Sequence, residues 1–70
     1  MSEVTAAQAA DIIGKSVMTI HRKVDEGALP ARLEGTTDRK FIYIAVDDLR
    51  SFAQKYGYRL DESLATQYAK

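Results

Sequence analysis

The feature of the sequence that most constrains the fold is a helix stop followed almost at once by a helix start. Gly14 ends a segment with helical spacing of apolar residues, because glycine readily takes the left-handed backbone conformation found after many helices. Ser16 is a favoured helix cap, and only Lys15 separates it from the glycine. Two helices joined by so short a turn must cross at a steep angle, so these residues predict a helix-turn-helix.

The first helix has a clear predicted start and a narrow buried face. Thr5 and Gln8 have the spacing of a capping box, in which each side chain accepts a hydrogen bond from the backbone of the other residue. Small and apolar residues then recur at intervals of three and four, the spacing of one helix face: Ala6, Ala9, Ala10 and Ile13. The alanines are expected to let another helix approach closely.

The second helix is predicted over residues 17–26, with Gly27 beyond its end. Its apolar side is expected to consist of Val17, Ile20 and Val24. The opposite side holds Met18, Thr19 and Arg22, with His21 and Lys23 on the flanks. Such a side is either an ordinary solvated surface or a surface that contacts DNA, and the short turn before it favours DNA.

The segment after Pro30 predicts a β-hairpin and a third helix. Residues 31–33 and 40–44 have strand character and flank a polar tip that is typical of a hairpin loop. In the second of these strands, Ile42 and Ile44 are expected to face inward. A third helix is then expected, capped by Asp47 and ended by Gly57, with a buried stripe of Leu49, Phe52, Ala53 and Tyr56.

The sequence divides into a domain over residues 1–57 and a tail over residues 58–70. The tail has helical spacing from Asp61, and a lone helix of this length is marginal in water. It is therefore expected to dock on the core, to lie at a protein interface or to fray. The candidate protein-contact residues of the tail are Leu60, Leu64 and Tyr68.

Composition excludes several kinds of protein. The chain has 70 residues, no cysteine and one histidine, which excludes a disulfide framework and argues against a zinc site. It has no apolar run that could span a membrane and no signal peptide, so we expect a cytoplasmic protein. Ten basic and ten acidic residues give zero net charge, which argues against an indiscriminate polycation. Residues 15–40 nevertheless carry six basic residues against four acidic ones.

The order of helix, tight turn, helix, hairpin and helix is that of a winged helix-turn-helix. The predicted fold class is therefore α+β, mainly helical, with a two-stranded β-hairpin wing. The sequence also resembles a known family. Residues 4–56 are similar to the excisionase-like DNA-binding domains related to the MerR group of regulators. The resemblance is carried by the segments AAQAADIIGKS, TIHRKVDEGALP and YIAVDDLRSF.

The resemblance implies roles for particular residues. Ser16 would begin the recognition helix, and Arg22 would contact DNA from it. The wing of the family is usually basic, and Arg39 and Lys40 stand at the equivalent place. MerR-type sensors continue into a dimerisation helix and an effector domain, which residues 58–70 are too few to form, so no small-molecule effector is expected.

The sequence departs from the family in two places. Lys15 stands where an apolar residue is usual, and the hairpin tip is longer than usual and contains Glu34 and Asp38. These acids weaken the expected contact between the wing and DNA.

Together these observations predict an interface with double-stranded DNA. The second helix and its start are expected to contribute Lys15, Ser16, Met18, Thr19, Arg22 and Lys23. The wing is expected to add Arg39 and Lys40, with Arg32 touching the DNA backbone.

The expected function is sequence-specific binding of duplex DNA, without catalysis and without a cofactor. The biological role would be that of a phage or mobile-element excisionase or a small transcription regulator, with an integrase or a second copy as protein partner and no membrane partner. One alternative is the DNA-recognition domain of a phage terminase small subunit. Another is an interaction adaptor that has lost DNA binding, which the pI near 6.5 favours. An enzyme is disfavoured, because no acid, base and nucleophile converge.

Overall fold

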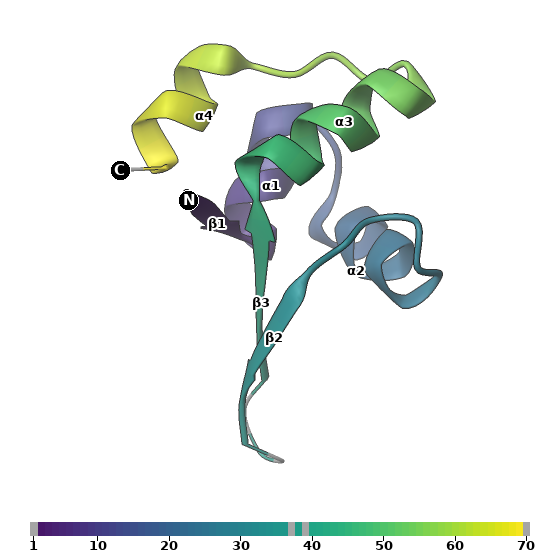
Figure 1. Cartoon of the computed structure of the whole chain (residues 1–70), viewed down its shortest axis with the longest axis vertical. Coiled ribbons are helices and arrows are strands. Elements are labelled where there is room, and N and C mark those ends of the chain that lie inside the picture. The colour runs from purple at the N-terminus through teal and green to yellow at the C-terminus, as the bar shows by residue number, and fades with distance from the viewer. Residues whose placement is uncertain (1, 37, 39, 70) are drawn as a thin grey trace.

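The structure is a computed structural model that describes residues 2–36, 38 and 40–69, with the side chain of Lys40 excepted. The described residues form four helices and a three-stranded antiparallel sheet (Figure 1). In chain order the elements are β1 (Glu3–Thr5), α1 (Ala6–Ile13), α2 (Val17–Asp25), β2 (Arg32–Gly35), β3 (Lys40–Ala45), α3 (Val46–Tyr56) and α4 (Glu62–Tyr68). The α+β winged helix-turn-helix predicted from the sequence is confirmed.

The turn between α1 and α2 forms as the sequence predicts. Gly14 has the left-handed conformation with φ of +68°, and the Lys15 N–H donates back to the carbonyl of Ala10 over 2.9 Å. Ser16 then caps α2, because its Oγ accepts from the Thr19 N–H over 3.1 Å. The capping box at the start of α1 is also present, with both of its hydrogen bonds. Local hydrogen bonds therefore fix where both helices begin and end.

The sheet has one strand more than the sequence analysis predicted. β3 lies in the centre, with β1 on one edge and β2 on the other. β1 has only three residues and pairs Val4 with Ile44, so that both side chains are buried. The boundaries predicted for the hairpin strands are also wrong by one or two residues, because pairing with β3 continues to Gly35. The β2–β3 hairpin of this sheet extends away from the helices (Figure 1).

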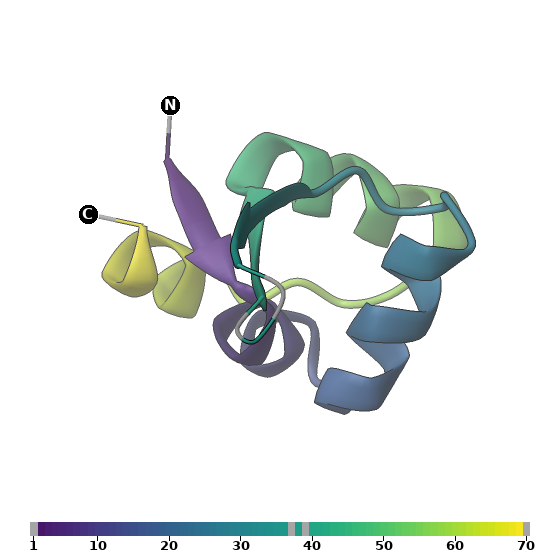
Figure 2. The same ribbon diagram turned by 90° about the horizontal axis from the view of Figure 1, so that it is seen from below.

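One core joins the sheet and the helices. Its most deeply buried large side chains come from six different segments, and they are Val4, Ile12, Ile20, Leu29, Ile44 and Leu49. Ile42 is half-buried against this core, which agrees with its predicted inward direction. Figure 2 shows α1 and α3 on opposite sides of the central strand, with α2 beside them. The position of α2 is thus fixed by burial of Ile20 and not by the turn alone.

Three predicted details of the helices are wrong. Val17 is 41% exposed and not part of the buried stripe, because as the first residue of α2 it lines the open hollow between α2 and the hairpin. Tyr56 is 40% exposed, since its ring lies beside Phe52 at the rim of the core. Asp47 does not cap α3. β3 runs directly into α3, and the Val46 N–H donates instead to the Ser2 carbonyl over 3.0 Å.

The tail forms α4 and docks on the core, which is one of the three outcomes expected from the sequence. Asp61 caps α4, and its own N–H donates to the Ile12 carbonyl over 2.8 Å. Ala65 is buried, and the Tyr68 hydroxyl donates to Asp11 over 3.2 Å. Figure 1 shows α4 lying along the helical body, far from the hairpin. Described residues of the tail, between 58 and 69, therefore pack against the core that also contains α1.

The docking of α4 leads to a stability prediction. Ala65→Asp should lower the free energy of unfolding by more than about 2 kcal/mol, because it buries a carboxylate without a partner. For a chain of this size that loss corresponds to a fall of roughly 10 °C in melting temperature. Thr66→Asp adds the same group at the exposed neighbouring position and is the matched control. Equal melting temperatures for the two variants would show that α4 does not dock in solution.

Candidate nucleic-acid interface

α2 presents a side that is directed away from the core. Ile20 is fully buried, whereas Met18 is 70% exposed and Arg22 is exposed. At 100° per residue, Arg22 lies nearly opposite the buried side of the helix. Among the described residues, the Arg22 guanidinium makes neither an ion pair nor a hydrogen bond within the chain. Its five N–H donors are therefore available for a ligand.

Two hydroxyl groups lie together at the start of α2. The Oγ of Ser16 is 3.0 Å from the Oγ1 of Thr19, in addition to capping the helix backbone. The pair has two hydroxyl hydrogens, and only one is needed for the bond between them. The second hydrogen can be donated to an acceptor outside the protein, such as a phosphate oxygen. Capping and ligand contact are thus compatible at this position.

Lys15 and Lys23 lie over aromatic rings at the end of α3 and just beyond it. The Lys15 Nζ is 4.8 Å from the ring centre of Tyr58, and the Lys23 Nζ is 5.2 Å from that of Tyr56. Lys23 also makes an ion pair with Glu26 over 3.6 Å. The sequence analysis placed Lys15 in the turn before α2 and Lys23 on its flank, but it did not predict tyrosines beneath them.

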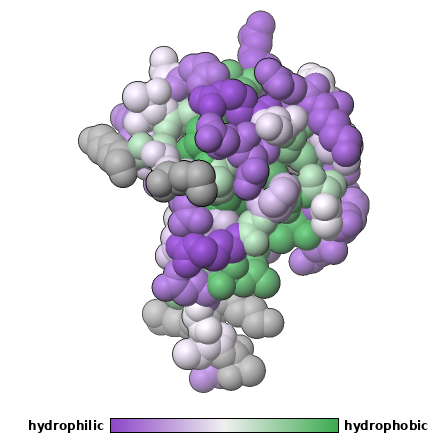
Figure 3. All heavy atoms as spheres, viewed as in Figure 1, coloured by the Kyte–Doolittle hydropathy of each residue, from purple (hydrophilic) through white to green (hydrophobic). Residues whose placement is uncertain are grey.

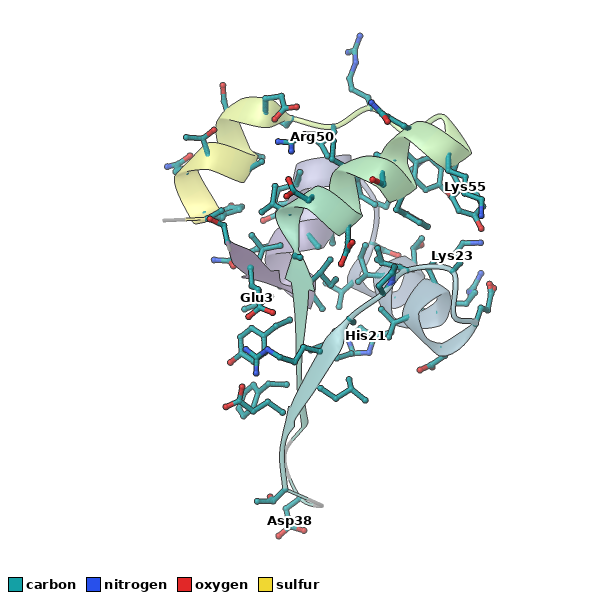
Figure 4. All side chains as sticks on the ribbon, in the orientation of Figure 1. Glu3, His21, Lys23, Asp38, Arg50 and Lys55 are labelled. Atoms are coloured by element: carbon teal, nitrogen blue, oxygen red, sulfur yellow. The ribbon has the colours of Figure 1, made fainter. Side chains whose placement is uncertain are left out.

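His21 lies on the flank of α2 that faces the hairpin (Figure 4). A hollow of about 230 Å³ separates this flank from the hairpin, and it is lined by Thr5, Ala6, Ala7, Val17, His21, Phe41 and Ile42. Figure 3 shows apolar atoms gathered where the hairpin joins the helical body. Leu33, which is 64% exposed, pairs in the strand register with Ile42 of the hollow's lining. The hairpin and α2 thus border one continuous surface.

Arg32 is held on the other face of the sheet. It pairs with Tyr43 in the register, whereas the next pair, Leu33 and Ile42, points to the opposite face. Its Nη2 donates to Glu3 over 2.8 Å, its Nη1 donates to Glu34, and its guanidinium lies 4.7 Å from the ring centre of Tyr43. The structure therefore does not place Arg32 beside the exposed side of α2. Its partner Glu3 belongs to β1, the strand that the sequence analysis missed.

The remaining wing residues are placed only in part. Arg39 lies outside the described residues, and Lys40 is placed by its backbone, which pairs with Gly35 in β3 and β2. Asp38 is exposed at the far end of the hairpin (Figure 4). The basic wing therefore stays a prediction.

The tail residues expected to contact a protein lie against the chain's own core. Leu60, Leu64 and Tyr68 are half-buried there. Burial and the hydrogen bond to Asp11 raise the pKa of the Tyr68 hydroxyl. Beside them, Arg50 connects α3 to α4 by donating to Glu62 over 2.9 Å, and this bond lowers the pKa of Glu62. A role of this stripe in protein contact stays a prediction.

Other kinds of site receive no support from the described residues. No three His, Cys, Asp or Glu side chains in that part of the chain lie close enough to hold a metal ion. Asp47, which could suggest acid–base chemistry, is hydrogen-bonded to Arg50 over 3.1 Å. No helix formed by the described residues is long and apolar enough to cross a membrane.

Comparison with known proteins gives one match. Residues 3–57 match the family model described as a helix-turn-helix domain. The match covers β1, both helices of the turn, the hairpin and α3, and it ends before α4. Neither the curated proteins nor the solved structures contain a match to the chain.

The Glu3–Arg32 pair leads to a prediction about pH. The hydrogen bond from Arg32 lowers the pKa of Glu3 from its ordinary value of 4.5. Ionised Glu3 therefore favours the folded state above pH 4.5, and this contribution is lost as the pH falls through the lowered pKa. Thermal unfolding would be measured from about pH 6 down to about pH 3, the range in which carboxyl groups titrate. Over this range the melting temperature should fall less for Glu3→Gln than for the unaltered chain.

Asp25→Asn is the matched control for this experiment, because it removes an exposed carboxylate of α2 that makes no ion pair among the described residues. Asp25→Asn should leave the slope of melting temperature against pH closer to that of the unaltered chain. An identical slope for Glu3→Gln and the unaltered chain would contradict the pairing.

Proposed function

The chain belongs to the family of excisionase-like helix-turn-helix domains and is a small DNA-binding protein, and we propose that it recognises specific sequences in duplex DNA. The observation that carries this proposal is the side of α2 that bears Arg22 and Met18. It combines an arginine that has no partner among the described residues with a highly exposed apolar side chain. Either feature alone is common on a solvated helix surface, and the proposal rests on their occurring together on the second helix of a helix-turn-helix. This side begins at the short turn of residues 14–16 and faces away from the core that buries Ile20.

The side chains of α2 match the chemistry of the major groove. Arg22 can donate two parallel hydrogen bonds to the O6 and N7 of guanine, or to a phosphate. Met18 can contact the methyl group of thymine, as apolar side chains do in the major groove. The spare hydroxyl hydrogen of Ser16 and Thr19 can be donated to a phosphate, which fixes the register of the helix.

The hairpin would lie on the adjacent backbone with Arg39 and Lys40, the wing residues implied by the family. Arg32 is not part of this contact in the proposal, because two carboxylates already bind its guanidinium. A domain of this size buries little DNA surface, so useful affinity needs a second copy or a protein partner on the same DNA. An integrase or a second copy fits this need, and the protein would act in the cytoplasm as an excisionase or a small transcription regulator.

One other function has a specific observation in its favour. An adaptor that has lost DNA binding would be consistent with zero net charge and with the engagement of Arg32 by Glu3 and Glu34. A DNA-recognition domain in a terminase small subunit shares the DNA contact and differs only in its role. Whether the chain binds duplex DNA at all separates the adaptor from the DNA-binding functions.

The proposal predicts a salt-dependent interaction that needs Arg22. Fluorescence anisotropy should show binding to random-sequence duplex DNA in about the micromolar range at low salt, weakening steeply as salt is added. Arg22→Ala should weaken this binding roughly tenfold, since it removes a bidentate or phosphate contact. It should also reduce the preference among selected DNA sequences.

Arg32→Ala is the matched control, because it removes the same side chain from the opposite face of the sheet. It should change DNA affinity much less than Arg22→Ala, with any loss of stability followed by melting temperature. No binding at low salt would contradict the proposed function and favour the adaptor.

A further inference from the structure

A ridge of lysines and tyrosines runs along the flank of α2 that is turned away from the hairpin. We call it the lysine–tyrosine ridge, and it consists of Lys15, Lys23, Lys55, Tyr56 and Tyr58. The rings of the two tyrosines are stacked with their centres 6.1 Å apart. Three ammonium groups lie against them: Lys15 at 4.8 Å from Tyr58, and Lys23 at 5.2 Å and Lys55 at 5.8 Å from Tyr56.

The ridge borders the exposed side of α2 directly. Around the helix, His21 and Lys23 lie on the two sides of Arg22 at 100° each. Figure 4 shows His21 toward the hairpin, whereas Lys23 lies near the end of α3 that carries Lys55. Across this surface the order is therefore hairpin, His21, Arg22, Lys23 and then Tyr56. The hairpin lies beside one flank of α2, across the hollow, and the ridge lies beside the other.

This order fits the shape of duplex DNA. A helix in the major groove, which is about 12 Å wide, has a phosphate backbone on each side. The hairpin can reach only the backbone on its own side of α2. The lysines and tyrosines of the ridge face the other side, where the second backbone must run if Arg22 points into the groove.

The chemistry of the ridge fits phosphate. Within the described residues, Lys15 and Lys55 make no ion pair, so their charges are not used inside the chain. The rings beneath them hold the ammonium groups on the surface by cation–π attraction. The hydroxyls of Tyr56 and Tyr58 make no hydrogen bond within that part of the chain, and each can donate to a phosphate oxygen. Glu26 pairs with Lys23 alone among the ridge lysines, and the Glu26 side chain is exposed, so water screens the pair.

We propose that the lysine–tyrosine ridge binds the DNA backbone on the side of the major groove away from the hairpin. The inference rests on the proposed function and adds Lys55, Tyr56 and Tyr58 to the DNA interface. These contacts go to phosphates, so they raise affinity for every sequence and also fix the orientation of α2 in the groove.

The test is anisotropy of the full chain on two duplexes of different sequence, over a salt series. Lys55→Gln should weaken binding to both duplexes equally and reduce the slope of log affinity against log salt by about 1. Tyr56→Phe keeps the ring and removes the hydroxyl, so it should weaken binding to both duplexes without changing the slope. Arg50→Gln is the charge-matched control, since Arg50 is on the same helix but is bound by Asp47 and Glu62.

The outcomes separate this proposal from the function on which it rests. A slope that falls for Lys55→Gln and not for Arg50→Gln supports the ridge. If the unaltered chain binds and Arg22→Ala weakens it, but Lys55→Gln has the affinity and slope of Arg50→Gln, the ridge proposal is overturned and the proposed function stands. If the unaltered chain does not bind either duplex at low salt, both are overturned.

Discussion

The structure depends on the turn at residues 14–16, because this turn sets the direction of α2 relative to everything else. A left-handed glycine and a serine cap leave only Lys15 between them in the connection of the two helices. α2 therefore leaves α1 at a steep angle, and the burial of Ile20 holds it there. Its other side must then face solvent. The exposed positions of Met18 and Arg22 follow from this geometry, and no element of the described chain covers them.

The basic residues divide into those that hold the fold together and those that are left over. Arg32 connects all three strands of one sheet face, since it contacts Glu3 and Glu34 and lies on Tyr43. Arg50 connects α3 to α4 through Glu62. The guanidinium groups of both arginines donate hydrogen bonds to carboxylates, and both lie away from the exposed side of α2. Of the other lysines and arginines, Arg22 lies on the exposed side of α2 and three lysines lie on the ridge beside it, so a chain of zero net charge still gathers basic side chains there.

Features that depend on neighbours in the sequence could be predicted, and those that depend on distant residues could not. The capping box at Thr5, the glycine turn and the serine cap of α2 are local, and the structure confirms them. β1 is too short for its alternation to be recognised, and it exists because Val4 is buried against Ile44. Missing β1 meant missing the partner of Arg32, a residue that sequence alone makes look like a DNA contact. The ridge was missed for the same reason, because its lysines and tyrosines come from separate segments.

The small number of available cations limits how this protein can use DNA. If Arg22, Lys15, Lys55 and the wing supply only a few phosphate contacts, each contributes about 0.9 to the salt slope, and non-specific affinity stays low. Discrimination then has to come from base contacts of α2, because the weak electrostatic term treats all sequences alike. A basic domain of the same fold would gain affinity everywhere along the DNA and lose this contrast. The carboxylates that hold Arg32 and Arg50 offset positive charge on surfaces away from α2, so under the proposed contact they also reduce the attraction of DNA to those surfaces.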